Sequence, residues 1–146
     1  MVKNFFLVIF ISILIIGCDS QILEPNIDYE NSTYYLNLES YLEQDENGYY
    51  HMNVLEDYTQ TFTTLTAKTG SFVNTQKISW TSDKELYLNN YWIPLVNGSS
   101  YTDELGEAHT VFSGWAEVIN DTITVFANYI DQFENNYLDS LKIIVE

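Results

Sequence analysis

The chain has 146 residues, of which 21 are acidic and 5 are basic, and its formal net charge at pH 7 is −16. This balance excludes nucleic acid as an expected partner, because phosphate binding needs a surface of Lys and Arg and the chain has no Arg. Hydrophobic residues make up 46% of the chain and aromatic residues 16%, which argues against disorder and favours one ordinary domain.

The amino terminus has the organisation of a signal peptide. Lys3 precedes an apolar run over residues 5–16, and the small residue Gly17 follows the run. As a helix the run is only about 18 Å long, whereas the hydrocarbon core of a membrane is roughly 30 Å thick. We therefore predict a cleaved signal peptide over residues 1–17 and no permanent transmembrane helix there.

The end of this segment is more specific than a general cleavage site. Ile15, Ile16, Gly17 and Cys18 resemble the lipobox of bacterial lipoproteins. The resemblance implies that the Cys18 thiol carries a diacylglycerol, that cleavage occurs just before it, and that the new amino terminus is acylated. Cys18 is the only cysteine and has no intramolecular disulfide partner. The alternatives are an ordinary signal peptide with an incidental cysteine, or a short core helix.

A lipidated Cys18 would attach the protein to the bacterial cell envelope without spanning the membrane. Asp19 is similar to an inner-membrane retention signal of enteric bacteria, whereas other Gram-negative groups read acidic residues near this cysteine as a signal for surface export. We expect the outer membrane or cell surface in preference to the inner membrane. Residues 18–32 contain Pro25, lack clean periodicity, and are predicted to be a lipidated tether.

Residues 33–146 are predicted to form a single β-domain. Tyr34, Leu36 and Leu38 alternate with their neighbours, although a helix over residues 36–44 also fits the spacing. The "DENG" sequence at 45–48 predicts a hairpin turn, and a second short strand follows it.

Later segments repeat the period of two that is typical of strands. They cover residues 59–69, 76–82, 86–96, 108–112, 121–130 and 140–146. Short strands separated by turn signals indicate an antiparallel β-sandwich, with Trp80 buried in its core.

Four short sequences occur in the order found in bacterial immunoglobulin-like domains. They are Ile78-Ser79-Trp80, the sequence "TDELGEA" at 102–108, "ITVFA" at 123–127, and Ile143-Ile144-Val145. Together they resemble domains of the invasin/intimin type over roughly residues 59–146. The resemblance implies an immunoglobulin-like fold and a role in adhesion or another protein–protein interaction.

An aromatic segment between residues 85 and 101 is the candidate ligand-binding surface. Tyr87, Tyr91, Trp92 and Tyr101 could form a protein-binding patch or a platform for carbohydrate, since aromatic rings suit both kinds of ligand. The same residues could instead alternate into the core of the sandwich.

No catalytic constellation stands out, and we predict neither an enzyme nor a cofactor. His51 and His109 are far apart and lack metal-ligand spacing, so no metal site is predicted. The acidic sequences at 45–47 and 103–104 could bind calcium weakly, but neither has the spacing of an EF-hand loop. A turn in which Asp103 caps its own backbone and Gly106 adopts a permissive conformation is the simpler interpretation.

These observations predict an envelope-anchored lipoprotein with a non-catalytic binding or structural domain. Its expected partners are the membrane, through the lipid anchor, and a protein or glycan ligand. The alternative function is a carbohydrate-binding accessory lipoprotein of a glycan-uptake system.

Overall fold

A computed structural model describes residues 35–55, 59–70, 75–96 and 98–146. The predicted signal peptide, Cys18 and the tether lie outside the described residues. Within them the chain is built from β-strands and contains one short 3-10 turn, Ala116–Val118, but no α-helix. The predicted all-β class is therefore confirmed. The strands are β1 (Leu36–Ser40), β2 (Glu43–Gln44), β3 (Tyr50–Met52), β4 (Gln60–Thr69), β5 (Lys77–Ser82), β6 (Glu85–Leu88), β7 (Tyr91–Pro94), β8 (Ser99–Tyr101), β9 (Glu107–Trp115), β10 (Thr122–Ile130) and β11 (Asn136–Val145).

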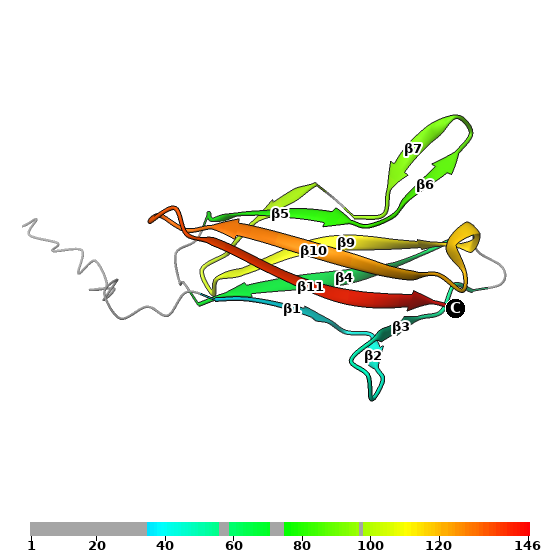
Figure 1. Cartoon of the computed structure of the whole chain (residues 1–146), viewed down its shortest axis with the longest axis horizontal. Coiled ribbons are helices and arrows are strands. Elements are labelled where there is room, and N and C mark those ends of the chain that lie inside the picture. The colour runs from blue at the N-terminus through cyan, green and yellow to red at the C-terminus, as the bar shows by residue number, and fades with distance from the viewer. Residues whose placement is uncertain (1–34, 56–58, 71–74, 97) are drawn as a thin grey trace, which may run out of the picture. The chain divides into compact units, whose positions relative to one another are not determined.

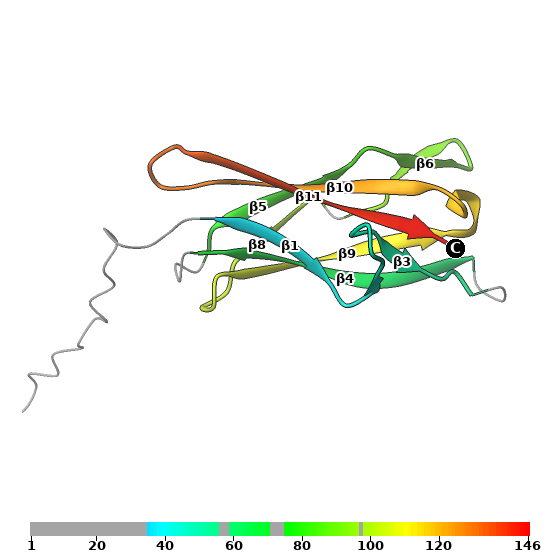
Figure 2. The ribbon, with the colours of Figure 1, turned by 60° about the horizontal axis from the view of Figure 1, so that its bottom comes forward.

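Most strands belong to two sheets, seen one behind the other in Figure 1 and from a second direction in Figure 2. Sheet A has the order β1-β4-β9, and sheet B has the order β2-β3-β11-β10-β5-β8. Strands β6 and β7 form a separate hairpin. Neighbouring strands are antiparallel except β3 and β11, which are parallel. The sequence predicted a wholly antiparallel fold, and this pair is the exception. It arises because the chain leaves sheet A after β1 and joins the edge of sheet B through β3.

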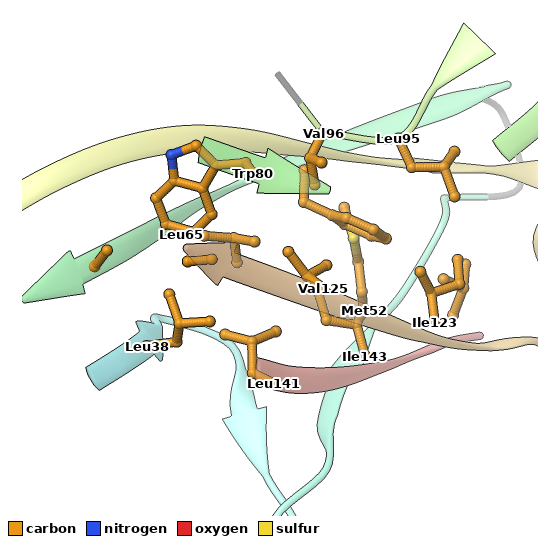
Figure 3. Close-up of a cluster of buried hydrophobic side chains, with 14 of the residues drawn as sticks. Leu38, Met52, Leu65, Trp80, Leu95, Val96, Ile123, Val125, Leu141 and Ile143 are labelled. Carbon is orange, nitrogen blue, oxygen red and sulfur yellow. The ribbon is translucent and has the colours of Figure 1, made fainter. Parts of the chain in front are cut away.

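The core lies between the sheets and follows the alternation of their strands. On β10, Ile123, Val125, Ala127 and Tyr129 are buried while the residues between them are exposed or half-buried, because successive side chains point to opposite faces. Figure 3 shows side chains from both sheets in one cluster, among them Leu38 and Leu65 of sheet A and Trp80, Val125 and Ile143 of sheet B. Trp80 is buried as predicted, and its indole Nε1 donates a hydrogen bond of 2.8 Å to Ser100 Oγ.

The structure differs from the expected elements in the first strand and in the long aromatic segment. The helix considered over residues 36–44 is wrong, since β1 and β2 occupy that range and Leu38 pairs with Ala67 of β4. The single strand predicted over residues 86–96 is also wrong. It is two strands, β6 and β7, joined by the two-residue loop Asn89-Asn90.

Candidate functional site: an aromatic hairpin

The β6–β7 hairpin carries three of the four aromatic residues predicted to bind a ligand. Asn89 and Asn90 form its loop, with φ angles of 52° and 68°. Positive φ at both loop residues is the requirement of a type I′ turn, and asparagine tolerates it better than most residues. Two consecutive asparagines between apolar residues were therefore a turn signal that the sequence prediction missed.

The hairpin has one face directed to the core and one face directed to solvent. Leu86 is buried, and Leu88 and Ile93 pack against the core from the same face. Tyr87 and Trp92 occupy the opposite face, where they are direct cross-strand partners. The inner face thus fixes the hairpin to the domain and leaves the Tyr87–Trp92 pair outside.

The two rings form an exposed pair with a defined geometry. Their centroids are 4.9 Å apart and their planes are inclined at 50°. Tyr87 is 54% exposed and Trp92 66%, and the Tyr87 hydroxyl lies 3.4 Å from Asn90 Oδ1. Aromatic pairs at this separation attract one another, so the rings support each other without being covered.

The other two predicted residues are also exposed but lie elsewhere. Tyr91 points to the same face as Leu88, at the end of the hairpin, and is 73% exposed. Tyr101 on β8 pairs with Lys77 at the start of β5, whereas the hairpin follows the end of β5. Five residues of strand separate these ends, about 17 Å at roughly 3.3 Å per residue. The structure groups Tyr87, Trp92 and Tyr91, and it separates Tyr101 from them. The alternative in which the four residues enter the core is wrong.

The two acidic sequences considered for calcium are capped turns of one kind, and a third such turn begins at Asp131. Turns beginning at Asp45, Asp103 and Asp131 join β2 to β3, β8 to β9, and β10 to β11. In each, Oδ1 of the aspartate accepts hydrogen bonds of 2.8–3.0 Å from the backbone N–H groups two and four residues later. Their carboxylates therefore cap the turn backbone, which confirms the turn predicted at Asp103.

Hydrogen bonding also explains the acidity of these groups. The backbone N–H of Glu107 lowers the pKa of Asp103, and that of Tyr49 lowers the pKa of Asp45, because both favour the charged carboxylate. Across the described ranges, no group of three or more His, Cys, Asp or Glu side chains is arranged to hold a metal ion.

The third turn was not recognised from the sequence because it has no glycine. In the first two turns the residue with positive φ is Gly48 or Gly106, whereas in the third it is Glu134, with φ of 66°. We expect Glu134→Gly to stabilise the domain by about 0.5–1 kcal/mol, since a left-handed conformation costs an L-residue roughly 1–2 kcal/mol and glycine recovers part of this. Urea unfolding measures the change.

The matched control for that substitution is Gly106→Ala at the same position of the Asp103 turn. It should destabilise the domain by about 1 kcal/mol, because it introduces the strain that the first substitution removes. A loss of stability in Glu134→Gly would contradict this account of the turns.

His51 lies between two carboxylates at one end of sheet B. Its Nδ1 is 2.5 Å from Oε1 of Glu146, its Nε2 is 3.5 Å from Oδ2 of Asp45, and Glu43 is its cross-strand partner on β2. The hydrogen bond to Glu146 raises the pKa of His51 above its ordinary value of 6.5.

A raised pKa in the folded state means that protonated His51 stabilises the fold. The contribution is fully present below pH 6.5 and is lost as the pH rises through the folded pKa. We expect the thermal midpoint of the native chain to exceed that of His51→Gln near pH 6, and the difference to shrink toward pH 9. Thermal unfolding of both proteins across this range measures it, and a difference that grows with pH would contradict the assignment.

A separate depression of about 220 Å³ lies beside sheet A. Lys68 is at its edge, 2.6 Å from Oε2 of Glu39 and 3.8 Å from Oε1 of Glu107. The hydrogen bond to Glu39 raises the pKa of Lys68, which keeps the amine protonated. A protonated lysine between two carboxylates is neither a base nor a nucleophile, so this depression offers no reactive amine.

Comparison with known proteins adds little to this description. No family model matches the chain, and a search of curated proteins found no match. Among solved structures the chain is similar to the crystal structure of Spo0M, a sporulation control protein from Bacillus subtilis, with 14% identity and a TM-score of 0.33. The match covers 77% of this chain and 49% of that protein, so the chain spans about half its length. A likeness of this size carries no argument about function. Among the described residues, no helix is long and apolar enough to cross a membrane.

Proposed function

We propose that the chain is an envelope lipoprotein whose immunoglobulin-like domain binds a protein partner through the β6–β7 hairpin. The observation that carries this proposal is the exposed Tyr87–Trp92 pair on a hairpin whose other face is packed against the core. Tyr and Trp are the residues that most often dominate the energy of protein interfaces. Because the hairpin is already held in place, a partner would not have to order it on binding.

The order of strand pairing supports the immunoglobulin-like assignment. In this proposal sheet A and the β11-β10-β5-β8 part of sheet B would be the two sheets of such a sandwich, and the first strand segment would be divided between them. Trp80, which is buried on β5, would be the core tryptophan of the third main strand. The role of β6–β7 in this scheme is that of an extra hairpin inserted after that strand.

The lipobox at Ile15–Cys18 supports the second part of the proposal, attachment to the cell envelope. The acyl groups would anchor the chain, and residues 18–32 would connect the anchor to the domain. Mass spectrometry of the mature amino terminus tests the anchor directly. A diacylglyceryl group on Cys18 is expected, and cleavage at another position would disprove it.

The ring geometry favours a protein over a glycan as the ligand. An extended sugar chain that stacks on two rings needs them close to one plane, whereas Tyr87 and Trp92 are inclined at 50°. A protein side chain can insert between inclined rings or against their edges.

Photo-crosslinking in intact cells tests the choice of ligand. A photoreactive amino acid at position 92 should give discrete protein adducts, and the same residue at the exposed Thr64 on sheet A is the control. Adducts of equal yield from both positions would contradict the proposal. Absence of protein adducts at position 92, together with glycan-array binding that Trp92→Ala abolishes, would support the carbohydrate-binding alternative instead.

A further inference from the structure

The outer face of the β11-β10-β5-β8 part of sheet B, called the neutral face below, differs in charge from the rest of this acidic protein. Its outward positions alternate with the buried residues of the same strands and are occupied by Ser99 and Tyr101 on β8, Lys77, Ser79 and Thr81 on β5, Thr122, Thr124, Phe126, Asn128 and Ile130 on β10, and Asn136, Leu138, Ser140, Lys142 and Ile144 on β11. None of these positions holds Asp or Glu, although the chain has 21 acidic residues. Two of them hold lysine.

Apolar side chains are grouped on this neutral face. Leu138 is 66% exposed, Ile130 57% and Tyr101 62%. Ile130 pairs with Asn136, and Leu138 pairs with Asn128, so the two apolar residues are diagonal neighbours across β10 and β11. Tyr101 lies in the same row as Ile130, on the far side of β5, and Lys77 occupies the position between them. The apolar group is therefore the Ile130–Leu138 pair, with Tyr101 two strands away.

Acidic residues surround this face without entering it. Asp103 and Asp131 lie in the turns beyond one end of the strands, and Asp83 and Asp121 lie near the other end. Beyond β11, Glu43 of β2 lies on the same side of the sheet, as the cross-strand partner of His51 on β3. Asp139 belongs to β11, but it is at an inward position, where its Oδ2 accepts a hydrogen bond from the backbone N–H of Leu38. Although β11 contains an aspartate, this carboxylate does not lie on the neutral face.

We infer that this neutral face binds a second copy of the same chain. Two molecules that each carry a formal charge of −16 repel one another where their carboxylates meet, and at close range the repulsion is incompletely screened. Sheet B offers a face on which two copies can come into contact without opposing carboxylates, and there each contributes the same apolar group. In a two-fold dimer both copies use the same surface, so a face that tolerates its own copy is suited to such a contact.

The size of the face sets the expected strength of the contact. The strands β8, β5, β10 and β11 have 3, 6, 9 and 10 residues. At about 4.8 Å between strands and roughly 3.3 Å per residue they give a flat area on the order of 450 Å² per copy, about 900 Å² for two copies, which is the size of a weak contact. The association should be weak in dilute solution. Anchoring both copies in one membrane would raise their effective concentration, in the way that a short linker does.

Site-specific crosslinking of the full-length chain in cells tests this inference. Leu138→Cys and Ser79→Cys on sheet B are treated with a bismaleimide reagent, and Phe62→Cys, exposed to a similar extent on sheet A, is the matched control. The unsubstituted chain, whose only cysteine is Cys18, gives the background. Covalent dimers are expected from the two sheet B positions and not from position 62.

Two further measurements separate this contact from random collision. Introducing a carboxylate by Ile130→Asp or Thr81→Asp in the Leu138→Cys chain should lower the dimer yield about tenfold, while far-UV circular dichroism shows that the fold is kept. In chain purified in detergent, the yield should rise between about 0.05 M and about 0.5 M salt, because salt screens the repulsion between the two copies. Equal yields from positions 62 and 138, no dimer at all, a yield that falls with salt, or folded Asp variants with unchanged yield would each overturn the inference.

Discussion

Trp80→Ala is expected to destabilise the domain by about 3–5 kcal/mol, as is typical of removing a large aromatic side chain from a packed core. Trp80 is 2% exposed and belongs to a core cluster that contains residues of both sheets (Figure 3). Substitution leaves a cavity and also leaves the Ser100 hydroxyl without its indole partner. A loss of this size is a large part of the stability of an ordinary domain.

Chemical unfolding monitored by circular dichroism measures the effect. The matched control is Trp92→Ala, which removes the same side chain from a site that is 66% exposed and should change stability by no more than about 0.5 kcal/mol. Equal effects of the two substitutions would contradict the core described here.

Gly114→Val is expected to destabilise the domain by about 1–3 kcal/mol or more through overpacking. Gly114 is buried on β9, and a Cβ added to it would lie 2.9 Å from Met52 Sδ and 3.5 Å from Val54 Cγ2. Valine would add two further methyl groups to this space. Glycine is therefore needed where β9 of sheet A passes close to the segment that contains β3.

A double-mutant cycle identifies the cause. Met52→Ala alone should cost about 2–5 kcal/mol, because Met52 is 1% exposed. Combined with Gly114→Val, it removes the clash that the valine creates. The double variant should therefore lose less stability than the sum of the losses of the two single variants. Fully additive losses would show that residues 52 and 114 do not compete for the same space.

The regular strands could be predicted from the sequence because they obey simple alternation. On β10 and β5 the buried residues are those that the period of two indicated, including Trp80. The turn at Asp103 was also predictable from two nearby residues. The aspartate accepts hydrogen bonds from the turn backbone, and the glycine three residues later adopts the positive φ angle that the turn needs. Local rules therefore supplied the regularly alternating strands, such as β5 and β10, and two of the three capped turns.

Features that depend on distant contacts could not be predicted in this way. The parallel pairing of β3 with β11 joins residues that are about ninety positions apart in the sequence, and no local pattern specifies it. The exposure of Tyr87 and Trp92 was ambiguous because both faces of their hairpin carry apolar residues, and only packing decides which face is buried. The neutral face of sheet B could not be predicted either, because it can be recognised only when the order of its four strands is known.

The exposed Tyr87–Trp92 pair is the centre of the proposed function, and the affinity of the protein crosslinked through position 92 tests it most directly. That partner, once isolated, is titrated against the native chain, Trp92→Ala, and the control Phe62→Ala, whose side chain is 61% exposed on sheet A. The account predicts a loss of about 30-fold or more for Trp92→Ala, as expected of an interface hot spot, with unchanged stability and no loss for the control. Equal affinities of Trp92→Ala and the native chain would contradict it.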